Sequence, residues 1–168
     1  AHRAASRLFE DKAVRKTYCA LVRGWLEGSG RVEHPLRRIS ESGHRSTDEG
    51  RLSAVTNWKS IECFEVMEPV GRFQTARYFL VELMPETGRI HQLRRHMKHL
   101  DHHIIGDTRY GDGVHNRFFR DHFGIRRLLL MAQLLRFEHP YSGRTLAVEA
   151  PLEDDWLKLA ALFGLPRH

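Results

Sequence analysis

The sequence PETGRIHQLRRHMKHL, residues 85–100, predicts a turn followed by a short amphipathic helix. Its apolar residues recur at intervals of three and four, the period of an α-helix, and these are Ile90, Leu93, Met97 and Leu100. Pro85 and Gly88 favour the turn, and the hydroxyl of Thr87 is a candidate N-cap. We therefore expect this helix to lie with its apolar face against the core.

Arg94 lies at the border of the apolar face of this predicted helix. At about 100° per residue it falls roughly 80° from the centre of the apolar stripe, whereas Arg95 and His99 point away from the stripe. A partly buried guanidinium needs a carboxylate partner, because an unpaired buried charge is costly. The question that follows is which carboxylate pairs with Arg94.

The length and composition are those of one globular domain. The chain has 168 residues, is 41% hydrophobic and 29% charged, and we expect a single domain over residues 1–168. No apolar run reaches the roughly 18 residues of a membrane span, and the first residues do not resemble a signal peptide. Cys19 and Cys63 lie far apart without a CxxC motif, which is typical of a reducing compartment, so we expect a cytoplasmic location.

The charge distribution points to a polyanionic partner. The formal net charge is +6, and residues 87–127 contain nine Lys or Arg against four Asp, together with seven of the twelve histidines. A basic surface of this kind either is merely solvated or faces phosphate groups. The concentration of basic residues in one segment favours the second interpretation.

Alternating apolar and polar residues predict several strands around this helix. We expect strands at 17–26, 54–67, 73–84, 128–139 and 145–152, and a short buried strand within HHIIGDTRYGDG at 102–113. Residues 2–13 and EDDWLKLAALFG at 153–164 have helical patterns, the second with acidic residues at its N-terminus. Residues 27–53 are polar and rich in Gly, Ser and Arg, which predicts a long loop.

Two clusters allow both a functional and a structural interpretation. His96, His99 and His103 would share one face of a long helix, but no HExxH motif or neighbouring cysteine accompanies them, so a metal site is the weaker hypothesis. Arginines flank three phenylalanines, Phe118, Phe119 and Phe123, which could stack on unpaired bases or pack on the core. The sequence contains no P-loop, GxGxxG or GxSxG motif, so a nucleotide cofactor has no support.

Four segments resemble the RluA-type pseudouridine synthases. RKTYCALVRGWL is similar to their KxYxAxVxG motif, ETGRIHQLRRHM to TGRxHQLRxH, HHIIGDTRYG to HPIxGDxxYG, and RLLLMAQLLRFEHPYSGRTLAVEAPL to their closing strands. The resemblance is greatest to the branch that acts on uridine 65 of tRNA. It implies an α+β fold, with a mixed, mostly antiparallel sheet flanked by helices.

The resemblance also implies an activity and roles for three residues. The family isomerises uridine to pseudouridine in RNA without cofactor or metal, and flips the target nucleotide out of its stack. Tyr18 matches the tyrosine that stacks on the target base and assists proton transfer. Arg94 matches the basic residue that pairs with the catalytic aspartate, and Leu83 matches the apolar wall beneath the site. By base rate alone, Tyr18 would be only a half-buried strand residue.

The catalytic aspartate of the family has no counterpart in this chain. It lies in an HRLD motif roughly thirty residues before the motif tyrosine, whereas only Asp11 precedes Tyr18 here, in an unrelated context. The resemblance therefore predicts that the partner of Arg94 lies upstream of Ala1, in a longer protein. On this hypothesis Arg94 is unpaired in the present chain, which should be less stable than the longer protein.

The remaining expectations concern partners. Residues expected to contact or steer RNA phosphates are Lys16, Arg89, His91, Gln92, Arg95 and Lys98. The expected partner is RNA, and tRNA in particular. We expect a monomer that neither associates with a membrane nor binds a nucleotide cofactor. Two alternatives remain open, a non-catalytic RNA-binding module that lacks the aspartate and a metal-dependent hydrolase that uses the histidine cluster.

Overall fold

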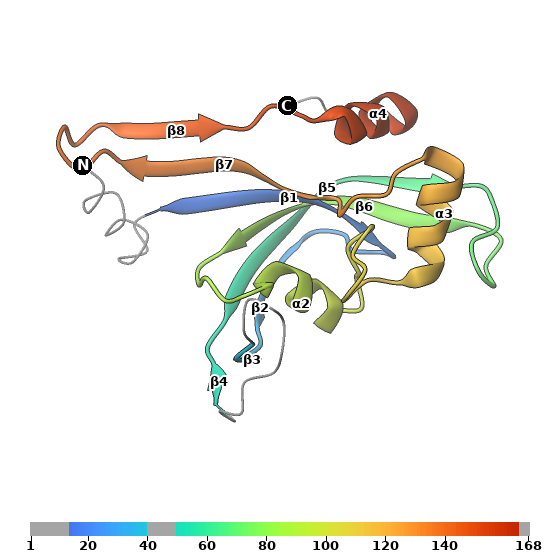
Figure 1. The fold of residues 1–168 in the computed structure, drawn as a ribbon, viewed down its shortest axis with the longest axis horizontal. Coiled ribbons are helices and arrows are strands. Elements are labelled where there is room, and N and C mark those ends of the chain that lie inside the picture. The colour runs from blue at the N-terminus through green and yellow to red at the C-terminus, as the bar shows by residue number, and fades with distance from the viewer. Residues whose placement is uncertain (1–13, 40–49, 165–168) are drawn as a thin grey trace.

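Six antiparallel strands form the central sheet, and helices pack against it (Figure 1). The structure is a computed structural model that describes residues 14–39 and 50–164. The order of the strands across the sheet is β2-β5-β6-β1-β7-β8. The strands are β1 (Arg15–Arg23), β2 (Ser29–Glu33), β5 (Val55–Val66), β6 (Ala76–Pro85), β7 (Leu130–Glu138) and β8 (Thr145–Glu149). The helices are α2 (Gln92–His99), α3 (Gly113–Phe123) and α4 (Asp154–Phe163).

The α+β class and the five longer predicted strands are confirmed, because each predicted range overlaps an observed strand. Every pairing between described strands is antiparallel, so the sheet in this part of the chain is not mixed. The helix expected over residues 2–13 lies outside the described residues. In the described part, no helix combines the length and the apolar character needed to cross a membrane.

The side chains of the central strands alternate between two hydrophobic clusters, one on each face of the sheet. Ala20 and Val22 of β1 belong to the cluster that also contains Leu93 and Met97 of α2. Side chains of the opposite parity in β1 and β6 meet α3 and α4. The strand residues of this second cluster include Cys19, Leu21 and Tyr78, and the helix residues include Phe118, Phe119, Trp156 and Leu159. Helix α2 therefore covers one face of the sheet, while α3 and α4 cover the other (Figure 1).

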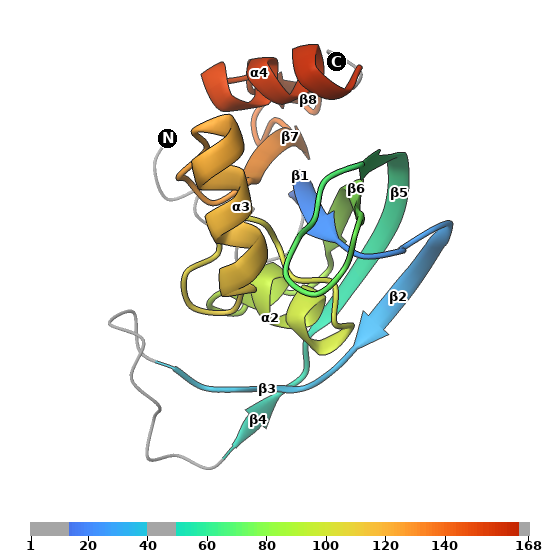
Figure 2. The ribbon, with the colours of Figure 1, turned by 90° about the vertical axis from the view of Figure 1, so that its right-hand side faces the viewer.

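The predicted loop over residues 27–53 is partly wrong. Strand β2 pairs with β5 along five residues, and β3 (Leu36–Arg37) pairs with β4 (Arg51–Leu52) as a short separate ribbon. Figure 2 shows this ribbon projecting from the main sheet on the side of α2. The polar composition concealed β2 because only one of its side chains, Val32, is buried, as expected for an edge strand.

The short strand predicted at 102–113 is also wrong. One isolated bridge joins Val22 and Ile104, and the chain then turns at Gly106. The carboxylate of Asp107 accepts hydrogen bonds from the backbone N–H groups of Arg109 and Tyr110, at 2.9 and 2.8 Å. These side-chain contacts replace a strand ladder and so end the extended conformation.

The predicted helix forms, but it begins later than its sequence suggests. Helix α2 starts at Gln92, and its N-cap residue, His91, has a left-handed backbone (φ 54°) without a side-chain cap. Thr87 is therefore not the cap, and its hydroxyl instead donates to Oε1 of Gln92 and accepts from the backbone N–H of Val55. Ile90, predicted on the buried face, precedes the helix and is 38% exposed.

Candidate active site

Tyr18 lies in the middle of β1, at an irregularity in the sheet. It is paired with Leu83 of β6 on one side and with Ala132 of β7 on the other. Because Thr17 pairs with Leu134, β7 carries one extra residue at this point, which is a β-bulge. Tyr18 is half-buried and packs against the cluster beneath α2, and Leu83 in that cluster is fully buried. The predicted wall residue and the predicted tyrosine are thus neighbours.

Arg94 has a carboxylate partner within this chain, which corrects the expectation that its partner lies upstream of Ala1. Its Nε donates to Oδ2 of Asp107 at 2.7 Å and its Nη2 donates to Oδ1 at 2.8 Å. The side chains are 18% and 1% exposed, so this is a bidentate and largely buried pair. The predicted loss of stability from an unpaired Arg94 therefore has no basis.

Asp107 anchors Arg94 and is unsuited to be the missing catalytic group. Its Oδ1 already accepts from Arg94 and from the backbone N–H groups of Arg109 and Tyr110. Burial tends to raise the pKa of Asp107, but these hydrogen bonds outweigh burial and lower it. The carboxylate is therefore ionised, enclosed and fully bonded, which leaves it unable to attack a substrate.

The pair with Asp107 leaves one end of the Arg94 guanidinium open. No hydrogen bond joins Nη1 to a described residue, and Arg94 lies on the wall of a pocket. The ring of Tyr110 lies 5.0 Å from the guanidinium carbon, and its hydroxyl is hydrogen-bonded to Nδ1 of His91 at 3.2 Å. Arg94 is therefore oriented from two sides while Nη1 can bind another acceptor.

This pocket has a volume of about 250 Å³ and unites most of the predicted site. Its walls come from β1, the turn after β6, the start of α2 and β7. The predicted residues among them are Lys16, Tyr18, Arg89, His91, Gln92 and Arg94. Burial lowers the pKa of His91, and the nearby charge of Arg94 lowers it further, so His91 is neutral at pH 7.

Gln92 borders the pocket, but its side chain is committed to the fold. It is 4% exposed, and its Nε2 donates to the carbonyl of Val55 and to Oγ1 of Thr56. Its Oε1 accepts from the hydroxyl of Thr87 and the backbone N–H of Arg89. All hydrogen-bonding groups of this side chain are thus used within the fold, where they fasten the start of α2 to β5 and leave none for the predicted RNA contact.

Arg95 and Lys98 face a second, larger hollow on the other side of α2. This hollow has a volume of about 690 Å³ and lies between α2 and the β3–β4 ribbon. Its lining contains five basic residues and no acidic residue among the described ones, and they are Arg37, Arg51, Arg95, Lys98 and Arg109. The guanidinium of Arg95 also donates to the carbonyl of Arg37 at 3.0 Å. The predicted RNA-contacting residues therefore line two separate concave surfaces.

The histidine cluster does not assemble a metal site. Among the described residues, no three histidine, cysteine or acidic side chains are close enough to hold one metal ion. His96 is fully buried and joins Oγ1 of Thr56 to the carbonyl of His34, while the ring of His99 stacks on that of His34 at 3.8 Å. The hydrolase hypothesis therefore has no support in this part of the chain.

Because His96 is buried, we expect the stability of the protein to depend on pH. The carbonyl of His34 requires Nε2 to be the donor, so Nδ1 of the neutral ring accepts from the Thr56 hydroxyl. Burial lowers the pKa of His96 below its ordinary value of 6.5, so only the unfolded chain takes up this proton as the pH falls. His96 thus contributes stability that is complete above pH 6.5 and is lost below it.

We expect the free energy of unfolding to fall between pH 7 and pH 5.5. Four other histidines have lowered pKa values and contribute to this slope, and they are His34, His91, His103 and His115. Replacing His96 with glutamine should reduce the slope by up to about 1.4 kcal/mol per pH unit, although the variant is less stable at pH 7. Urea unfolding at several pH values measures this, and an unchanged slope would contradict the assignment.

The three phenylalanines of α3 pack on the core. Phe118 is 6% exposed and Phe119 is 0% exposed, and Phe123 packs against the same cluster. The hypothesis that they stack on bases is therefore wrong. The arginines beside these phenylalanines lie on the solvent face of an amphipathic helix. In the sequence, such a helix shows the same mixture of arginine and phenylalanine as a surface that stacks on bases.

Gly106 positions Asp107, and its replacement should be costly. The backbone has φ +78°, and a Cβ atom there would lie 1.8 Å from the carbonyl oxygen of Arg127. Gly106→Ala should lower the free energy of unfolding by roughly 2 kcal/mol or more. Gly113→Ala is a matched control, because a Cβ atom on Gly113 would have no neighbour within 4 Å. Equal melting temperatures for the two variants would show that the loop adapts.

The comparisons with known proteins agree with this fold. The family model described as RNA pseudouridylate synthase matches residues 1–99. The chain therefore belongs to the RNA pseudouridylate synthase family. It is 45% identical over 161 residues to tRNA pseudouridine synthase C of Vibrio cholerae, covering 94% of this chain and 66% of the relative. It is 42% identical over 168 residues to the protein of that name from Salmonella typhi, covering 98% and 64%.

A solved structure, human RNA pseudouridylate synthase domain containing 1, has the same architecture. It superposes with a TM-score of 0.66 and 28% identity, over 89% of this chain and 59% of that chain. The chain spans 64–66% of the length of these two bacterial relatives. The structural likeness confirms the fold that the sequence motifs imply.

Asp107 and Tyr110 orient Arg94, and the sequence alone did not point to either residue. Both lie within the motif HHIIGDTRYG, which was assigned to a strand and a turn without a role in the site. The signal was present, since an aspartate between glycines is typical of a turn whose side chain bonds the backbone. Its pairing with Arg94, 13 residues away, depends on the turn after α2 and could not be read from helical spacing.

Proposed function

We propose that the protein containing this chain converts a uridine of tRNA to pseudouridine. The observation that carries the proposal is one pocket whose wall contains both Tyr18, the cross-strand neighbour of Leu83, and Arg94 with an open Nη1. Family membership supports the reaction, and the printed names of the bacterial relatives support tRNA as the substrate. The motif resemblance adds a finer expectation, that the target is uridine 65.

The reaction is an isomerisation that needs no redox partner. The bond between N1 of uracil and C1′ of ribose breaks, a bond from C5 to C1′ forms, C5 loses its proton, and N1 is protonated. In the pocket, the ring of Tyr18 stacks on the flipped uracil and its hydroxyl assists proton transfer at C5. Leu83, the buried cross-strand neighbour of Tyr18, helps to fix the position of its ring.

Arg94 would serve a carboxylate that lies outside the described residues. The motif resemblance predicts this catalytic aspartate upstream of Ala1, and Nη1 of Arg94 is the group left to pair with it. A positive charge at that point keeps the aspartate ionised. Asp107 is in this scheme a positioning residue, since it acts by holding Arg94.

The basic residues around the pocket supply phosphate contacts. Lys16, Arg89 and His91 line the pocket, and Arg95 and Lys98 line the hollow beyond α2. Contacts of this kind release counterions from RNA, so tRNA affinity should fall steeply with salt.

We further propose that the protein is a cytoplasmic monomer. Size-exclusion chromatography tests the oligomeric state, and cell fractionation tests the location.

The direct test uses the full-length protein and a tRNA transcript labelled with tritium at C5 of uridine. Isomerisation releases the label into water, and chemical mapping then locates the pseudouridine. Release from one uridine of the transcript supports the proposal. Tight, salt-sensitive tRNA binding without release would instead support the non-catalytic RNA-binding module and overturn the proposed reaction.

A further inference from the structure

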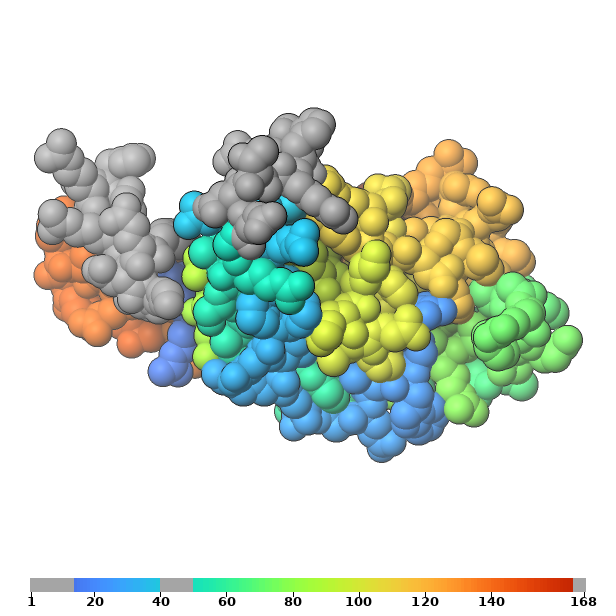
Figure 3. Space-filling model, turned by 90° about the horizontal axis from the view of Figure 1, so that it is seen from below, coloured from blue at the N-terminus to red at the C-terminus, as the bar shows by residue number. Residues whose placement is uncertain are grey.

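A third hollow lies at the C-terminal end of β1, beyond Tyr18 and the pocket that it lines. It has a volume of about 650 Å³ and is bounded by the end of β1, the β5–β6 connection and the residues after α2. Arg23 is five positions after Tyr18 along this extended strand, a distance of roughly 16 Å. Figure 3 shows the face that carries α2 in yellow-green, with the green β5–β6 connection on one side of it and the β3–β4 ribbon on the other.

Two exposed aromatic rings border this hollow, each beside an arginine. Trp25 and Phe73 are each 55% exposed. The guanidinium carbon of Arg77 lies 4.8 Å from the ring of Trp25, and that of Arg72 lies 5.0 Å from the ring of Phe73. Large aromatic side chains left in solvent on a concave surface mark an interaction site more often than a single exposed leucine does.

The backbone holds Trp25 in this exposed position. Gly24 has φ +89°, and its N–H donates to the carbonyl of Arg77 at 2.8 Å. A Cβ atom on Gly24 would lie 3.2 Å from Nδ1 of His102, which itself is hydrogen-bonded to the carbonyl of Arg23. Trp25 also makes an edge contact with Phe79 of the core. Its ring is therefore preorganised and loses little freedom on binding.

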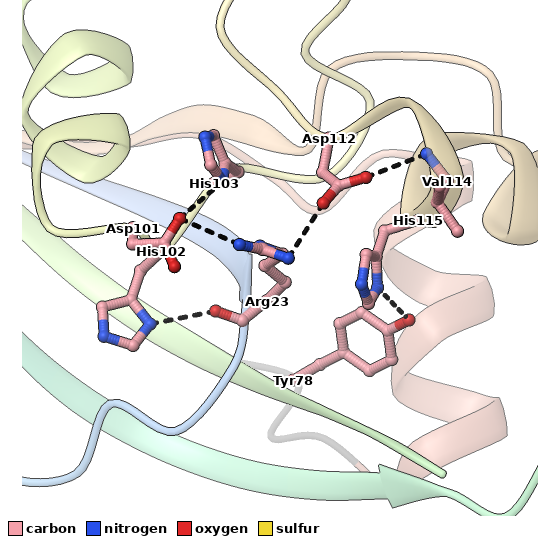
Figure 4. A network of polar contacts seen from close by, with 8 residues as sticks. All are labelled: Arg23, Tyr78, Asp101, His102, His103, Asp112, Val114 and His115. Carbon is pink, nitrogen blue, oxygen red and sulfur yellow. Dashed lines mark hydrogen bonds and ion pairs between the residues drawn. The ribbon is translucent and has the colours of Figure 1, made fainter. Parts of the chain in front are cut away.

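A network of polar contacts around Arg23 borders the hollow (Figure 4). Arg23 donates to Asp101 and to Asp112, both at 2.9 Å, and Asp112 also caps α3 through the N–H of Val114. Two carboxylates thus offset the charge of Arg23. Arg72 forms no ion pair with a described residue, and Arg77 is 3.4 Å from Glu65 with half of its side chain exposed. Arg72 and Arg77 are the cations most open to a ligand.

We propose that this hollow binds an unpaired nucleotide of the substrate RNA, distant from the target uridine. The inference rests on the proposed function and extends it. Bases stack on exposed aromatic rings, and the adjacent guanidinium groups suit the phosphates on either side of the base. A ligand that occupies both this hollow and the Tyr18 pocket must span roughly 16 Å, which a folded RNA does and a mononucleotide does not.

Fluorescence tests the stacking directly. Trp156 is 3% exposed and Trp58 is partly buried against the core, so Trp25, at 55%, is the most exposed tryptophan among the described residues. A short single-stranded RNA should quench the emission of the full-length protein, and Trp25→Phe should remove that quenching. Polyphosphate is the control, since it carries charge without bases. Equal quenching by polyphosphate, or quenching that persists in the variant, would overturn the proposal.

Kinetics with tRNA provide the second readout. The double variant Trp25→Ala, Phe73→Ala should raise the KM for tRNA about 10-fold or more and leave kcat unchanged, because the hollow does not contact the reacting atoms. Tyr141→Ala is the matched control, because Tyr141 is 69% exposed on the β7–β8 turn. An unchanged KM in the double variant overturns the inference while the isomerase function stands.

Arg72→Glu is a third test, which remains available if the Trp25→Ala, Phe73→Ala double variant does not fold. Arg72 is exposed on the β5–β6 connection, and reversing its charge should weaken tRNA binding at least about threefold, most of all at low salt. Unchanged affinity would count against the proposal. If the full-length protein makes no pseudouridine, the proposed function fails, whereas the RNA titration still decides whether the hollow binds RNA.

Discussion

Arg94→Ala in the full-length protein should lower pseudouridine formation by about 10²–10³-fold, while tRNA affinity changes little. The reason for the first effect is that the alanine removes the preorganised charge that, in the proposed mechanism, keeps the catalytic carboxylate ionised. The pocket and the basic hollow keep their other cations, which explains the second effect. Tritium release and filter binding measure the two quantities separately.

The same substitution should also destabilise the protein, by about 3 kcal/mol. It leaves the carboxylate of Asp107, with 1% of its side chain exposed, without its charged partner. Reduced turnover must therefore be separated from unfolding, by measuring rates well below the melting temperature of the variant. The circular dichroism spectrum at that temperature shows whether the variant is folded.

Arg94→Lys is the informative control for this effect. A lysine keeps the positive charge but has one nitrogen, so it cannot contact both oxygens of Asp107 and also present a donor to the pocket. We expect it to restore part of the stability and little of the turnover. Turnover equal to that of the wild type in either variant would refute the role of Arg94.

The strands of this fold could be predicted because their residues alternate, but the partner of Arg94 could not. Its need for a carboxylate follows from local helical geometry, since the side chain lies at the border of the buried face. Its choice of Asp107 depends on a turn at Gly106, which brings together groups 13 residues apart. Periodicity contains no information about such a contact. A motif resemblance marks Asp107 without saying what it touches.

Gln92 shows a second limit of reasoning from residue types. It stands in a basic motif among residues that face the pocket, so a phosphate contact was a reasonable expectation. The structure instead uses all of its hydrogen-bonding groups to join α2 to β5. A polar side chain at the start of a helix can serve the ligand or the fold, and only its burial decides between them.

Tyr18→Phe should reduce turnover by about 10²-fold or more with little change in stability or in tRNA affinity. The hydroxyl of Tyr18 forms no hydrogen bond with a described residue, so its removal leaves no buried group unpaired, and the unfolding free energy should change by less than about 0.5 kcal/mol. The phenyl ring remains to stack on uracil. What is lost is proton transfer, whose contribution is of this size.

Tyr18→Leu and Tyr141→Phe divide the contributions of the ring and the hydroxyl. The leucine removes the stacking surface as well as the hydroxyl, so its turnover should fall below that of the phenylalanine variant. Tyr141 lies on the exposed β7–β8 turn, outside the pocket, and its loss of a hydroxyl should have no effect. If Tyr18→Phe turns over as fast as the wild type, Tyr18 is only a stacking residue. Proton transfer at C5 must then be assigned to another group of the pocket or to water.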